Sequence, residues 1–141
     1  MARAPDHPAR AATDGLAWAV RPMLIALVAA SLASGIAGGL LRVGVGLAPE
    51  AGWLGRAAVA HAALMVCGFL GTVIGIERAV AVKLRLAFLA PLASGLGGLA
   101  LLLGHGRAAA WVIVMAALVF VGVNVVVVLR QRAAHTLALL V

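Results

Sequence analysis

The chain has 141 residues, of which 65% are hydrophobic and 11% charged, and its formal net charge is +7. Its mean hydropathy of +1.18 excludes a water-soluble globule, because too few polar side chains remain to cover a surface. Disorder is excluded as well, since disordered chains are poor in apolar residues. The basic residues are spread between apolar runs, so we expect no nucleic-acid partner. A single cysteine, Cys67, excludes an intrachain disulfide and a CxxC site.

The first apolar run predicts a transmembrane helix over 22–41, preceded by a cytoplasmic tail over 1–21. Pro22 suits the first turn of this helix, because the N–H group that proline lacks would have no partner there. A cleaved signal peptide is the competing interpretation. We favour the membrane span, because the run stays uncharged to Leu41 and is longer than the apolar part of a signal peptide.

Three further apolar runs predict transmembrane helices over 57–82, 86–104 and 108–129. None of the runs alternates polar and apolar residues, which excludes a membrane β-barrel. The sequence therefore predicts an all-α integral membrane bundle of four transmembrane helices within residues 22–132. Residues 133–141 begin another apolar run, and we expect them to start a fifth helix of a longer protein. A short interfacial tail is the alternative.

Basic residues predict how the bundle is oriented. Eight lie in the two tails and the second loop, namely Arg3, Arg10, Arg21, Arg78, Lys83, Arg85, Arg130 and Arg132. Three lie in the other two loops, namely Arg42, Arg56 and Arg107. Because positive loops stay in the cytoplasm, we expect both termini to be cytoplasmic and the protein to lie in a bacterial inner membrane. The lipid bilayer is its first expected partner.

Small residues recur at every fourth position in the first and third runs. They are Ser31, Gly35 and Gly39, and then Ala90, Ser94 and Gly98. Such ridges let helix backbones approach closely in lipid. We expect packing within one chain, with self-association or another membrane subunit as the alternative. The segments 32–39 and 92–99 are also similar, which indicates either a duplicated helical hairpin or coincidence in a chain rich in Leu, Ala and Gly.

The second run contains the one histidine inside a predicted span, His61. At helical spacing it shares a face with Met65, and with Gly68, Thr72 and Ala79 further along. An imidazole and a thioether are ligand types for haem iron or copper, and intramembrane ionisable residues are functional candidates. The structural alternative, which the residues alone favour, is a histidine bonded to a carbonyl of a neighbouring helix, with Met65 filling the core.

Two further regions bear on this candidate site. His105 lies in the third loop and could be a second ligand, although a solvated loop residue is the simpler interpretation. If the fourth helix runs antiparallel to the second, residues 111–115 lie at the depth of His61 and should support it.

A separate polar cluster is expected at the cytoplasmic end. Glu77, Arg78 and Asn124 should lie at similar depth, and a poorly solvated acid needs a partner. We expect a structural ion pair, with a proton-relay carboxylate as the alternative.

The segment His61-Ala62-x-x-Met65-x-x-Gly68-Phe69, followed by Ile74, resembles the HAxxMxxGF segment of the NnrS family. It is also similar to a helix of uncharacterised bacterial membrane proteins of the form HxxxMxxGFLGTxIxxERA. The NnrS resemblance implies a many-helix inner-membrane protein of nitric oxide metabolism in which His61 binds haem or copper. The chain differs from that family at Glu77–Arg78, where the family continues apolar, and it lacks a second intramembrane histidine.

Three classes of function therefore remain open. The first is a haem- or copper-binding protein of redox or nitric-oxide metabolism, based on His61 and Met65. The second is a small transporter or channel, based on the repeat and on Glu77. The third is a structural or assembly subunit, based on the small-residue ridges. The sequence contains no P-loop, GxSxG, HExxH or dinucleotide-binding motif, so no soluble-type catalytic machinery is expected.

Overall fold

A computed structural model describes residues 8–46 and 52–131, and within these ranges every regular element is a helix. Four helical segments are long and apolar enough to cross a membrane. They are Val20–Arg42, His61–Val82, Arg85–Leu102 and Gly106–Leu129. The prediction of an all-α bundle with four membrane-spanning helices is therefore confirmed, and the chain is an integral membrane protein.

The first helix, α1, runs over Pro8–Arg42 and begins well before the predicted span. Pro22 lies inside this helix, so its expected place in the first turn is wrong. The segment before Pro22 is rich in alanine, the strongest helix former, and it continues the helix through residues expected to form a tail. The predicted boundary relied on hydrophobicity, which marks where a helix enters lipid and not where it starts.

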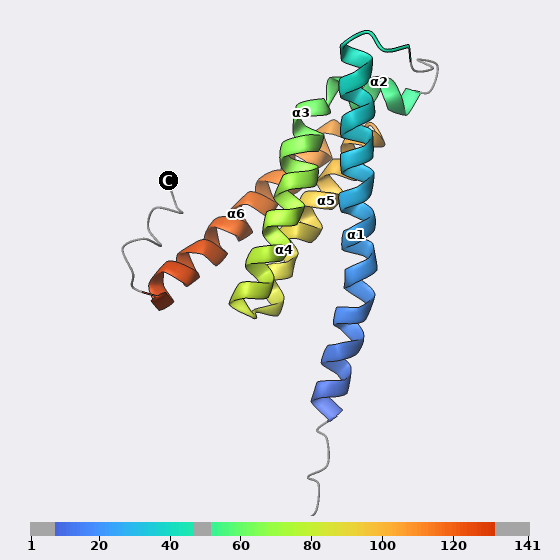
Figure 1. The fold of residues 1–141 in the computed structure, drawn as a ribbon. Coiled ribbons are helices and arrows are strands. Elements are labelled where there is room, and N and C mark those ends of the chain that lie inside the picture. The colour runs from blue at the N-terminus through green and yellow to red at the C-terminus, as the bar shows by residue number, and fades with distance from the viewer. Residues whose placement is uncertain (1–7, 47–51, 132–141) are drawn as a thin grey trace, which may run out of the picture.

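The second predicted span is divided near its start. Helix α2 covers Gly52–Val59, and the membrane span then begins with α3, His61–Ala63. Between them Ala60 has φ −90° and ψ 9°, outside the α-helical region, and the chain changes direction there. Helix α2 lies across the end of the bundle, beside the end of α1 (Figure 1). The span therefore starts at residue 61 and not at 57 as predicted.

The remaining elements complete two further spans. The second span continues through the π-helix η1, Leu64–Leu70, into α4, Gly71–Val82. The third consists of the 3-10 turn η2, Arg85–Phe88, and α5, Leu89–Leu102. The fourth is α6, Gly106–Gln131.

Helices α1, α4 and α5 pack together, whereas α6 packs along α5 and tilts away from α1 (Figure 1). The α5–α6 contact is close at Gly97, where an added Cβ would lie 2.5 Å from Ile113 Cγ1. Further along, Val123 of α6 joins Ala79 of α4 and Ala87 of η2 in a small apolar cluster. The fourth span is the least buried, with 17% of its most apolar window inside the structure against 39% for the third.

A tight turn joins α4 to η2. Lys83 closes α4 in the left-handed region, with φ 56° and ψ 28°, and its N–H donates to Ala79 O. This conformation costs a non-glycine residue about 1–2 kcal/mol. It nevertheless lets two membrane spans follow each other with almost no loop, which brings α4 and α5 side by side.

The contact between α1 and α2 depends on Gly38, because an added Cβ would lie 2.8 Å from Ala58 N. We expect Gly38→Ala to lower the free energy of unfolding by about 1–3 kcal/mol, since only backbone could move to relieve the overlap. Gly122 on α6 is the matched control, because an added Cβ there meets nothing within 4 Å. Thermal unfolding in detergent checks both, and Gly122→Ala should be neutral or stabilising. Equal losses in the two variants would contradict this account.

Candidate functional site

The second span contains a seven-residue π-helical segment, Leu64–Leu70. Its last backbone bond runs from Gly71 N–H to Val66 O, five residues back. In an α-helix that N–H would donate to Cys67 O, so the Cys67 carbonyl loses its usual donor. The hydroxyl of Ser94, on α5, donates to this carbonyl instead. Wide turns of this kind are frequent at functional sites, which makes the segment the natural centre of a candidate site.

Three helices meet beside the π-helical segment. An added Cβ at Gly68 would lie 2.9 Å from Ser31 Oγ on α1, and one at Gly98 on α5 would lie 3.2 Å from Gly68 Cα. The adjoining Thr72 hydroxyl donates to Gly68 O at 2.6 Å. We name Ser31, Gly68 and Gly98 the triple contact. It leaves no space for a ligand, so any bound group must lie outside it.

The predicted polar face of the second span is partly reproduced. Gly68, Thr72 and Ala79 are buried, as expected. In the preceding turn Leu64 is fully buried, whereas Met65 is only half-buried. A π-helical turn takes more residues than the 3.6 of an α-helix, so Met65 is rotated away from the line through Gly68. Sequence spacing assumed a uniform α-helix and could not show this rotation.

His61 is half-buried, and its ring is held by α1. Its Nδ1 lies 2.7 Å from Gly35 O. A carbonyl only accepts, so in the neutral imidazole Nδ1 carries the hydrogen and Nε2 keeps its lone pair. The ring lies against Gly39, where an added Cβ would be 2.8 Å from Cε1. Met65 packs in the same way on Gly35, where an added Cβ would be 2.6 Å from Sδ.

These contacts match the structural interpretation of the two residues: a histidine bonded to a carbonyl of a neighbouring helix, and a methionine that fills space beside it. They also agree with a ligand role, because a metal-binding histidine commonly donates its other ring N–H to a carbonyl. The geometry therefore fits both a packing role and a ligand role for His61, and what distinguishes the two roles is whether Nε2 binds a metal.

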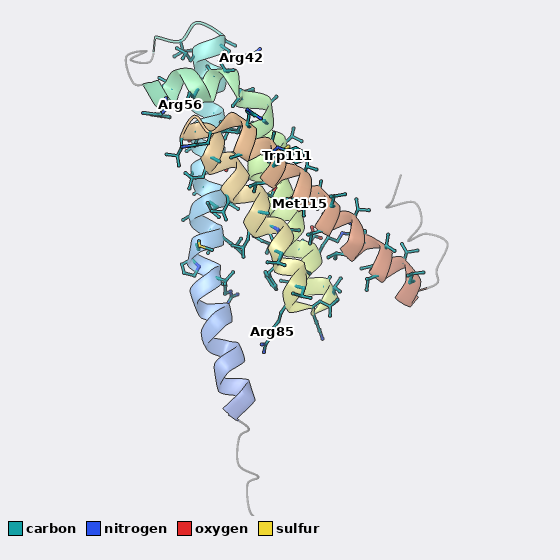
Figure 2. All side chains as sticks on the ribbon, turned by 180° about the vertical axis from the view of Figure 1, so that it is seen from behind. Arg42, Arg56, Arg85, Trp111 and Met115 are labelled. Atoms are coloured by element: carbon teal, nitrogen blue, oxygen red, sulfur yellow. The ribbon has the colours of Figure 1, made fainter. Side chains whose placement is uncertain are left out.

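The prediction that residues 111–115 of the fourth helix support His61 is wrong. Trp111 is 71% exposed and Met115 is 55% exposed, and both lie on α6, which packs on α5 (Figure 2). His105 is exposed in the turn before α6, and its backbone N–H donates to Ala100 O. Among residues 8–46 and 52–131, no three His, Cys, Asp or Glu side chains come together closely enough to hold a metal ion.

The polar cluster expected near the cytoplasmic end does not form as predicted. Asn124 is buried, but its Nδ2 donates to Phe120 O on its own helix at 2.9 Å. Glu77 is exposed and makes no hydrogen bond within the described residues. Glu77 lies two residues, about half a turn, from both Gly75 and Ala79, two of the three buried positions of α4, so it points away from the bundle. Arg78 is half-buried and completes no pair with Asn124 in this part of the chain.

The two small-residue ridges are used within the chain, as expected. On α1, Ser31 contacts Gly68 and Gly98, and the next two ridge positions receive Met65 and His61. On α5, Ser94 donates to Cys67 O. The π-helical segment itself was not predicted. The one signal in the sequence is the pair Gly68 and Gly71 followed by Thr72, where small residues and a hydroxyl can satisfy freed carbonyls.

Residues 21–141 match a family described as a domain of unknown function, DUF8744. The chain belongs to this family. No curated protein and no solved structure matches the chain. The DUF8744 match covers all four spans except Val20, so His61, the π-helical segment and the triple contact all lie within the family's domain.

The bond from Ser94 to Cys67 O can be tested by Ser94→Ala. Loss of an interhelical bond in a membrane protein costs on average about 0.6 and at most about 1.7 kcal/mol. We expect the upper part of this range, because Gly71 N–H, the donor that Cys67 O would have in an α-helix, bonds Val66 O instead. The control is Ser34→Ala on α1, a half-buried serine without a hydrogen bond among the described residues. Thermal unfolding in detergent measures both. A loss no greater than that of Ser34→Ala would show that Cys67 O has another donor.

Proposed function

We propose that the chain is a multi-pass protein of the bacterial inner membrane that binds haem or copper through His61 and takes part in redox or nitric-oxide metabolism. The observation that supports this proposal is the bond from His61 Nδ1 to Gly35 O, 2.7 Å long. It orients the ring and leaves Nε2 as the nitrogen able to bind a metal. The resemblance of the segment from His61 to Phe69 to the NnrS family points to the same chemistry.

The donor set fits some metal groups better than others. A structural zinc site needs four ligands, and the described residues offer no three acidic, histidine or cysteine groups together. Haem can be held by one axial histidine, and copper accepts imidazole with a thioether, for which Met65 is the nearest candidate. Because one side of the His61 ring lies on Gly39 and the triple contact leaves no space, the group would lie beyond both, on the side of Nε2. When bound, such a metal supplies one-electron redox chemistry.

Absorbance and metal content of detergent-purified protein, expressed with haem and copper available, test this proposal. We expect a Soret band or stoichiometric copper in the wild type and its loss in His61→Ala. His105→Ala is the matched control, because that histidine is exposed in a turn and should leave the signal unchanged. Met65→Leu should keep the metal but shift its spectrum if the thioether is a co-ligand. A wild type with neither absorbance nor metal would return His61 to a packing role.

The proposed orientation places the termini in the cytoplasm. Lys83 and Arg85 lie at the α4–η2 turn, whereas Arg42 and Arg56 lie at the opposite end of the bundle (Figure 2). Positively charged loops favour the cytoplasmic side. Reporter fusions after residues 47 and 106 should therefore read as periplasmic, and fusions after residues 83 and 132 as cytoplasmic. The reverse pattern would place His61 near the cytoplasmic face.

A further inference from the structure

The end of the bundle that carries α2 gathers arginines from three helices. We name Arg42, Arg56 and Arg107 the α2-end arginines; they come from the end of α1, from α2 and from the first turn of α6. All three are exposed. Arg42 and Arg56 lie together at this end of the molecule, far from Arg85 at the other (Figure 2).

Two of these arginines are fixed in place by the backbone. Arg42 Nη1 donates to Ala58 O of α2 at 3.4 Å, and Arg56 Nε donates to Leu102 O of α5 at 2.6 Å. The Arg56 side chain also packs on Gly104, where an added Cβ would lie 3.4 Å from its Cδ. These contacts close the ends of two helices and hold the guanidinium groups above the ends of the spans.

The two hydrogen bonds to backbone carbonyls occupy only part of the guanidinium groups of Arg42 and Arg56. A guanidinium has five N–H donors, and each of these two bonds occupies one of them. Among the described residues the acids are Asp14, near the start of α1, and Glu77, in the second half of α4, so neither lies at the end that carries α2. Within the described part of the chain, a net positive charge and N–H groups that these two bonds do not use therefore remain at this end.

The depth of the α2-end arginines in the membrane indicates which part of a lipid they contact. Arg42 is the last residue of the first span and Arg107 is the second residue of the last, so both lie at the level of the lipid headgroups. Trp53 precedes Arg56 by three residues on α2 and is 46% exposed, which suits an amphipathic ring at the same interface. The planar guanidinium matches the oxygens of a phosphate in a bidentate manner.

We propose that the α2-end arginines bind the phosphate of an anionic phospholipid headgroup. The fixed positions of Arg42 and Arg56 lower the entropy lost on binding, since two of the three side chains are already ordered. The lipid in turn covers the end of the bundle where α1, α2 and α5 meet. This site is independent of any metal at His61.

Thermal unfolding of the full chain in detergent, with phosphatidylglycerol added, tests the proposal. We expect the melting temperature to rise with lipid concentration and to saturate, because a ligand of the folded state stabilises it. Phosphatidylcholine and inorganic phosphate at matched concentrations should not reproduce the rise. Arg107→Gln is the informative variant, since among the described residues the Arg107 side chain donates no hydrogen bond, in contrast to Arg42 and Arg56. It should weaken the apparent lipid affinity about fivefold.

Arg85→Gln is the matched control, an exposed arginine at the opposite end, and it should leave the response to phosphatidylglycerol unchanged. Arg56→Lys keeps the charge but loses the planar fork, so it should weaken binding even if its own melting temperature without lipid is lower. The proposal is overturned if Arg107→Gln responds like the wild type, or if Arg85→Gln loses as much. It is also overturned if inorganic phosphate or phosphatidylcholine stabilises the protein equally.

Discussion

The bundle depends on the close approach of three backbones at Ser31, Gly68 and Gly98. In lipid there is no hydrophobic gain from bringing apolar helices together, so packing and polar contacts must hold them. A Cβ at either glycine would come within about 3 Å of Ser31 Oγ or of the facing backbone. Because Gly68 and Gly98 have no side chains, α1, the π-helical segment and α5 come into contact at one point. The neighbouring contacts of His61 and Met65 follow from that approach.

The π-helical segment puts a second requirement on the same region. A backbone carbonyl without a donor is costly in a membrane, because no water can replace the lost bond. Ser94 meets this need from α5, and Thr72 adds a hydroxyl to Gly68 O from within its own helix. The hydroxyl of Ser94 can reach because Gly71 has no side chain, and an added Cβ there would lie 2.6 Å from Ser94 Oγ. The lack of a side chain at Gly71 therefore permits both the close packing of α5 and the hydrogen bond from Ser94.

Composition and span length were enough to predict four membrane helices, because the demand for about 20 apolar residues is a property of lipid. The small-residue ridges could also be predicted, since Ser31 on α1 and Ser94 on α5 each belong to a series of small residues at every fourth position. The break at Ala60 and the π-helical segment were not predicted, because hydrophobicity marks how long a span is and not the local geometry of its backbone. Asn124 shows the same limit: its depth was predicted, yet its amide bonds its own helix and leaves Glu77 outside. The position of a residue along a helix is therefore easier to predict from the sequence than the direction in which its side chain points.

The α1 ridge joins stability to the candidate site. Gly35 supplies the carbonyl that bonds His61 Nδ1, and Gly39 supplies the bare surface on which the ring lies. Gly35 and Gly39, which let α1 approach the second span, therefore also determine which nitrogen of the His61 ring keeps its lone pair. Such a histidine has one bonding direction left, and no other His, Cys, Asp or Glu group in the described part of the chain completes a closed ligand set around it. A single oriented nitrogen would fit a group that needs only one protein ligand better than a structural ion, which needs four.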